Sequence, residues 1–105
     1  MSLFGWIRPR RRRRSNYSRG IATERMIAGR LRNKGYLVRQ SPGSRGPYDL
    51  YALRGGRKTL VQVKRGSSPF TKADRARLRS AARNKGAKAY LMRVKRGRIS
   101  SRIVY

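Results

Sequence analysis

Asp49, Gln62 and Lys64 have the residue types and the spacing to bind a cation or to take part in catalysis. They lie on two short segments rich in Tyr, Leu and Val, residues 48–53 and 59–64, which read as paired strands. If the segments pair as expected, Asp49 falls opposite Gln62 with Cβ atoms about 5 Å apart. Lys64 points to the same face as Gln62, because side chains alternate along a strand. A carboxylate, an amide oxygen and an ammonium group are therefore expected to meet.

The turn between the two segments sets this pairing. The sequence Arg54-Gly55-Gly56-Arg57 contains a Gly-Gly pair, which accepts the positive φ of a tight two-residue turn. Such a turn pairs Arg54 with Arg57, and four residues further along it pairs Leu50 with Val61. The hairpin therefore has one predicted register.

The composition limits both the class of binding partner and the kinds of catalytic or metal site that the chain can have. The 105 residues include 30 Lys plus Arg but only three acids, for a formal net charge of +27. Such a chain repels itself, and nucleic acid relieves that repulsion through phosphate neutralisation and counterion release. An acidic membrane surface is the weaker alternative, since no segment approaches the roughly 20 apolar residues of a spanning helix. Without Cys or His, disulfides, zinc fingers, thiol nucleophiles and histidine bases are excluded, so any metal must be a hard, oxygen-liganded ion.

A helix is predicted from Ser18, as N-cap, to Lys34, with Gly35 as its stop. Its apolar face is formed by Ile21, Ile27, Ala28 and Leu31. Glu24, the only acid in this helix, lies in the middle of that face. A buried carboxylate is costly unless it is paired or bound to metal. Two interpretations remain open: an internal salt bridge to an arginine, or a site residue that reaches the hairpin.

Further elements complete the order helix, strand, hairpin, helix, strand, strand. A short strand is predicted at residues 36–39, a helix at 72–85, and two strands at 87–94 and 99–104. Thr71 and Asp74 form the pattern of a capping box, which gives Asp74 a structural role. This order predicts an α/β domain over residues 16–105, with helices flanking a mixed sheet.

Two segments outside these elements carry candidate contacts. The loop at residues 40–46 holds Ser41 and Ser44, which either satisfy turn backbone or touch a ligand. Residues 1–15 form a basic arm in which apolar residues precede the charges, the reverse of a secretory signal. The arm is expected to be disordered and to add phosphate affinity, or to be ordered by a partner.

Several of these residues together resemble a known family. Glu24 in the first helix, Tyr48-Asp49 opening the second strand and Gln62-Val63-Lys64 on the third are similar to the motif of the PD-(D/E)xK nuclease superfamily, which has the restriction endonuclease-like fold. The segments 18–25 (SRGIATER), 34–39 (KGYLVR) and 44–50 (SRGPYDL) resemble the archaeal-type Holliday junction resolvases. The resemblance covers roughly residues 17 to 93 and implies the element order α-β-β-β-α-β-β.

The resemblance implies a cytoplasmic homodimer, in a prokaryotic, archaeal or virus-infected cell, that hydrolyses phosphodiesters in branched DNA with Mg²⁺, which Mn²⁺ can replace. Asp49 would be the central metal ligand, with Gln62 and Glu24 as further ligands. Lys64 would hold or activate the attacking water, and the site serine maps to Ser44 or Ser41. Candidate DNA contacts from this interpretation and from the charge pattern are Arg10, Arg11, Arg12, Arg13, Arg14, Arg19, Arg25, Arg45, Arg65 and Lys72.

Gln62 departs from the common motif, which has an acid at this position. The site then carries at most two negative charges and should hold metal more weakly, although Gln-x-Lys also occurs in active members of the superfamily. Two alternatives stay open. One is another endonuclease of this fold, of the homing or mismatch type. The other is a catalytically silent nucleic-acid-binding protein, or a small ribosomal-type protein.

Overall fold

Seven elements follow one another in the predicted order. The computed structural model describes the chain over residues 16–41 and 46–105, with side chains described from residue 22 onward. The elements are α1 (Asn16–Asn33), β1 (Leu37–Gln40), β2 (Leu50–Arg54), β3 (Arg57–Arg65), α2 (Lys72–Lys85), β4 (Lys88–Lys95) and β5 (Arg98–Ile103). The predicted fold class and order α-β-β-β-α-β-β are confirmed.

The five strands form one mixed sheet in the order β1-β2-β3-β4-β5. Only β3 and β4 are parallel, and α2 makes the crossover that a parallel pair requires. The hairpin of β2 and β3 has the predicted register, with Arg54 opposite Arg57 and Leu50 opposite Val61. Gly55 and Gly56 both have positive φ, 55° and 80°, as the two-residue turn demands.

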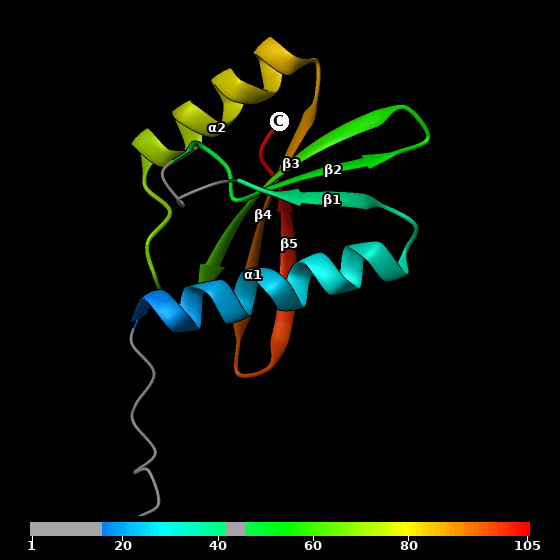
Figure 1. Cartoon of the computed structure of the whole chain (residues 1–105). Coiled ribbons are helices and arrows are strands. Elements are labelled where there is room, and N and C mark those ends of the chain that lie inside the picture. Colours follow the sequence, from blue (N-terminus) through cyan, green and yellow to red (C-terminus); the bar gives the residue numbers. More distant parts are fainter. Residues whose placement is uncertain (1–15, 42–45) are drawn as a thin grey trace, which may run out of the picture.

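Each face of the sheet is covered by one helix (Figure 1). Ile27 and Leu31 of α1 pack against Leu50 and Val61 on one face. On the other face, α2 packs against the side chains that alternate with these, namely Leu60, Ala89 and Leu91, through its own Leu78 and Ala82. Because β3 contributes Val61 to one cluster and Leu60 to the other, its side chains alternate between the two helices. Gln62 and Lys64 therefore share the α2 side with Leu60.

The helix ends agree with those predicted from the sequence except at the start of α1. Helix α1 begins at Asn16, so the prediction of Ser18 as its N-cap is wrong. Nothing in Asn16-Tyr17 breaks a helix, and a serine within the first turns is tolerated. Gly35, with φ 94°, ends α1 as predicted. The capping box of Thr71 and Asp74 at the start of α2 is confirmed.

The basic arm at residues 1–15 lies outside the described residues. Within the described part of the chain, no helix is long and apolar enough to cross a membrane.

Candidate active site

The candidate site lies where β2 ends and leaves one edge of β3 unpaired. The pairing of β2 with β3 stops at Leu50 and Val61, whereas β3 stays paired with β4 as far as Arg65. Asp49 lies one residue before β2, and its backbone N–H donates to the carbonyl of Val61 (2.8 Å). The next N–H on the same edge of β3, that of Val63, donates to Oδ2 of Asp49 at 2.7 Å. The carboxylate thus takes the place of a strand partner.

Asp49 is one of only two buried polar side chains described, with 7% of its surface exposed. Burial raises the pKa of this carboxyl above its usual value, and the Val63 N–H and the Lys64 ammonium partly offset that rise. A carboxylate held in this way is oriented by its backbone contact but incompletely neutralised. It is suited to bind a cation on its free side.

Glu24 approaches the same carboxylate from α1. Burial and, next, the charge of Asp49 raise the pKa of Glu24 to about 7. The two acids are therefore close enough to repel each other, as expected for carboxylates that share a ligand. Among the side chains described, the ion pairs are Lys64–Asp74 and Arg77–Asp74, and neither involves Glu24. The lack of an arginine partner for Glu24 among these ion pairs favours its interpretation as a site residue over an internal salt bridge.

The raised pKa of Glu24, caused by burial and then by the charge of Asp49, predicts how stability depends on pH in the absence of metal. The folded state keeps the proton of Glu24 at a pH where the unfolded chain has lost it, so the free energy of unfolding should fall as pH rises from about 4.5 to 7. At 1.36 kcal/mol per pKa unit the shift corresponds to about 3 kcal/mol, which solvent screening of this half-buried group reduces to on the order of 1 kcal/mol.

Glu24→Gln is therefore expected to raise the melting temperature at pH 7.5 in EDTA by roughly 4 °C. The same substitution should have little effect at pH 3.5, where Glu24 is largely protonated both in the fold and in the unfolded chain, whose ordinary pKa is 4.5. Thermal melts of both proteins across this range test the raised pKa without any activity assay. Equal pH slopes for wild type and variant would show that the fold does not raise the pKa of Glu24, and would contradict its placement beside Asp49 in a partly buried site.

Lys64 lies between two acids. Its ammonium lowers the pKa of Asp49, and its Nζ lies 3.9 Å from Oδ2 of Asp74 at the start of α2. Asp74 also accepts hydrogen bonds from the Thr71 backbone N–H (3.1 Å) and from Arg77 (2.7 Å), and these contacts lower its pKa. The sequence predicted the capping role of Asp74 but not its contact with Lys64. The one available signal was that Asp74 follows Lys64 by ten residues across a short loop.

Gln62 lies on β3 between Val61 and Val63 and is half-buried. On the α2 side of β3 it is two residues from Lys64, at the edge that Asp49 closes. In the described residues, no group of three or more His, Cys, Asp or Glu side chains could hold a metal. The donors available at this edge are the carboxylates of Glu24 and Asp49 and the amide oxygen of Gln62. Two mutually repelling carboxylates with an amide oxygen form a donor set that fits a hard divalent cation.

The structure describes only some of the remaining candidate residues. Ser41 is half-buried, and its backbone N–H donates to the carbonyl of Asp49 (2.8 Å), so it stands next to the site. Ser44 lies outside the described residues. Of the predicted DNA contacts, those with described side chains are exposed: Arg25, Arg65 and Lys72. Arg10, Arg11, Arg12, Arg13, Arg14 and Arg45 lie outside the described residues, as does the side chain of Arg19 on α1.

The sequence profile of the archaeal Holliday junction resolvase (Hjc) family matches residues 15–103, which include the whole site. The chain belongs to this family. The family match spans both helices and all five strands, so it includes Glu24 on α1 as well as the hairpin.

Two known proteins are similar to the chain. It is 34% identical over 86 residues to the crossover junction endodeoxyribonuclease Hjc of Sulfurisphaera tokodaii, a match that covers 73% of this chain and 60% of that protein. The chain thus spans less than two thirds of that relative's length. The crystal structure of Archaeoglobus fulgidus Hjc, a Holliday junction resolvase, has the same fold, with a TM-score of 0.74 at 23% identity over 83% of this chain and 74% of the other.

Proposed function

We propose that the chain is a magnesium-dependent endonuclease that cuts four-way DNA junctions. The observation that carries this proposal is the meeting of Glu24, Asp49 and Lys64 at the open edge of β3, from an α-helix, a strand start and a strand. The Sulfurisphaera tokodaii relative is a crossover junction endodeoxyribonuclease, and the similarity covers most of the length of this chain. The charge of +27 supplies the general affinity for DNA.

The residues of the site would have different roles in hydrolysis. Asp49, Glu24 and the amide oxygen of Gln62 would hold Mg²⁺, or Mn²⁺ in its place, which when bound polarises the scissile phosphate and favours ionisation of a water. Lys64 would hold the attacking water and offset negative charge on the pentacovalent phosphate. The backbone contact from Val63 fixes the direction of the Asp49 carboxylate before DNA arrives, because the N–H is part of a rigid strand.

A homodimer fits this function because resolving a four-way junction requires two cuts, and each subunit would supply one site. The substrate is then recognised through the spacing of two sites as well as through phosphate contacts, which carry no sequence information.

The substrate is tested by cleavage of a mobile four-way junction and a linear duplex built from the same arms, each with Mg²⁺ or with EDTA. We expect paired, symmetric nicks in the junction, Mg²⁺-dependent, with at most weak cutting of the duplex. Sequence-dependent cutting of the duplex would favour a homing-type enzyme. Tight binding of both substrates without cutting would favour the silent DNA-binding protein, which the small number of carboxylates at the site supports as the second candidate.

Gln62→Glu should strengthen metal binding if Gln62 is a ligand. A third carboxylate raises the negative charge facing the cation, and we expect the Mg²⁺ concentration for half-maximal cleavage to fall about tenfold. Asn84→Glu, which adds the same charge on the exposed surface of α2, serves as the control and should leave the Mg²⁺ requirement unchanged. An unchanged requirement for Gln62→Glu as well would remove Gln62 from the ligand set.

A further inference from the structure

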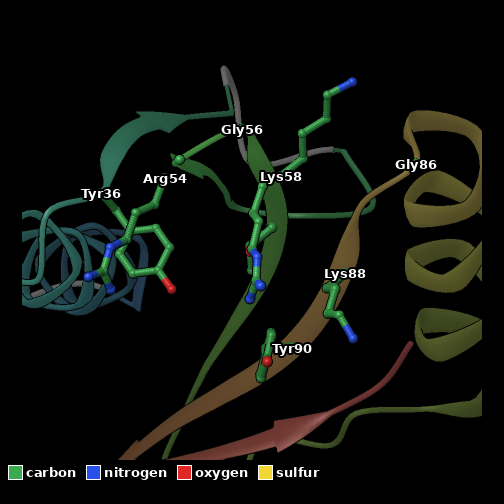
Figure 2. Close-up of a pocket in the computed structure, with 10 residues that line it drawn as sticks. Tyr36, Arg54, Gly56, Lys58, Gly86, Lys88 and Tyr90 are labelled. Atoms are coloured by element: carbon green, nitrogen blue, oxygen red, sulfur yellow. The ribbon is translucent and has the colours of Figure 1, made fainter.

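A pocket lined by cationic side chains lies at the other end of the hairpin from the candidate active site. Figure 2 shows its lining, which comes from the start of β1, both sides of the β2–β3 turn, the end of α2 and the start of β4. We call it the turn-end pocket and define it by six side chains: Tyr36, Arg54, Arg57, Lys58, Lys88 and Tyr90. Its volume is about 570 Å³, and Gly55, Gly56 and Gly86 leave its rim free of side chains.

Four of the six side chains that define the turn-end pocket are cationic and none is acidic. The three acids of the whole chain, Glu24, Asp49 and Asp74, belong to the candidate active site or contact its lysine. No acidic side chain is therefore left to neutralise this pocket. Like charges gathered in one hollow raise the local potential, and an anion relieves their repulsion.

Two of the cations are held in place by the fold. The guanidinium of Arg54 lies over the ring of Tyr36, with Cζ 5.6 Å from the ring centroid. Lys58 donates from Nζ to the carbonyl of Lys85 at the end of α2 (3.3 Å). Arg57 and Lys88 are exposed beside them, on neighbouring strands β3 and β4. The pocket is thus a partly ordered cationic surface with two side chains free to meet a ligand.

The position of the pocket points to a backbone phosphate of bound DNA. Thr59 lines the pocket and lies three residues before Gln62 on β3, a separation of roughly 10 Å. The turn is six residues before Gln62, or roughly 20 Å. At about 3.4 Å per nucleotide of one strand, these distances correspond to roughly three to six nucleotides.

Positive charge also continues between the two sites. The surface of α1 from Glu24 to its C-terminal end exposes Arg25, Arg30 and Arg32, and no acid follows Glu24 in the helix. A DNA arm that leaves the active site toward the hairpin turn would meet cations along this path.

We propose that the turn-end pocket binds phosphates of the DNA arm that leaves the active site, roughly three to six nucleotides from the scissile phosphate. The inference rests on the proposed function only in taking DNA as the ligand; it does not require that the chain cut DNA. The role of the pocket would be to fix the direction of the DNA arm, since phosphate contacts set register and orientation.

The test compares two double variants in binding to the four-way junction in EDTA at several salt concentrations. Arg57→Gln with Lys88→Gln removes the two free charges of the pocket. Arg79→Gln with Arg83→Gln removes two exposed charges from α2, on the opposite face of the sheet. Each phosphate contact contributes about 0.9 to the salt dependence, so the pocket variant should lower the slope of log affinity against log salt by about 2 and weaken binding at least tenfold at 0.1 M salt. The α2 variant should leave the slope nearly unchanged.

Phosphate ethylation interference locates the contact. With wild type we expect interference near the cleaved position and in a second cluster three to six nucleotides away, and the pocket variant should lose the second cluster alone. An equal loss of slope in both double variants would show that only total charge matters and would overturn the inference. A change of oligomeric state in the pocket variant, measured by light scattering, would also overturn the inference, since the pocket would then be a subunit contact.

The outcomes separate this inference from the proposed function. A chain that binds the junction with a pocket-dependent slope but never cuts it would refute the endonuclease and leave the pocket assignment standing. A chain that cuts the junction with the same interference pattern in the pocket variant would refute the pocket assignment alone. No binding of wild type to DNA would refute both.

Discussion

Replacing Asp49 with alanine is expected to lower the rate of junction cleavage about 100- to 1,000-fold while leaving junction binding at least as tight as in wild type. The loss follows because Asp49 is the buried carboxylate on which the proposed metal site is centred, and removing one preorganised electrostatic group from a reaction centre costs about 10² to 10³ in rate. Binding should hold because the substitution removes negative charge from a surface that receives phosphates. Single-turnover cleavage and gel-shift titrations of the same junction measure the two effects.

Asp49→Asn separates the charge from the structural role of this side chain. An asparagine oxygen can still accept the hydrogen bond from Val63, so the β3 edge should keep its geometry. Because burial raises the pKa of Asp49, the charged form is disfavoured in the fold, and the neutral variant should melt no lower than wild type at pH 7.5 in EDTA. Cleavage by Asp49→Asn at the wild-type rate would show that the carboxylate is not a metal ligand.

Lys64→Ala should produce the second large effect, a loss of about 100-fold or more in cleavage rate with little change in junction affinity. One lysine among 30 basic residues contributes little to total attraction, but the loss of a cation at the reacting phosphate removes stabilisation where charge develops. The measurement is the single-turnover rate at saturating enzyme, which excludes binding effects.

Asp74→Asn is the matched control for Lys64. It weakens the 3.9 Å contact between Lys64 and Asp74 but leaves the ammonium in place. If Lys64 serves the reaction, the control should cut within a few-fold of wild type and lose at most about 1 kcal/mol of stability through its weakened capping box. Equal cleavage losses for both variants would mean that Lys64 acts mainly by holding α2 against the sheet.

The hairpin could be predicted because the determining signals are local. Gly55 and Gly56 set the turn, the turn sets the register, and alternation then places Gln62 and Lys64 on one face. The predicted pairing of Asp49 with Gln62 is not part of the sheet, because the ladder of β2 and β3 ends at Leu50 and Val61. Asp49 lies just before β2 and meets the backbone of Val63 through its side chain, an arrangement that pairing rules alone do not contain.

Other features depend on how distant elements pack and could not be read from the sequence. The capping box at Asp74 is a local pattern and was predicted, but its contact with Lys64 depends on where α2 settles on the sheet. The turn-end pocket draws residues from segments around Tyr36, Arg57 and Lys88, which no motif connects. The start of α1 was misplaced because a serine is a good N-cap but also an acceptable helical residue.

The most direct test of the site is the addition of Mg²⁺ to a preformed complex of the wild-type chain with a four-way junction labelled on two opposing strands, beside the same complex of Asp49→Asn. Nicks at symmetric positions in both labelled strands of the wild-type complex, and intact strands in the variant complex, are the predicted result. Intact strands in both complexes, with the junction still bound, would contradict the assignment of Glu24, Asp49, Gln62 and Lys64 as a hydrolytic site.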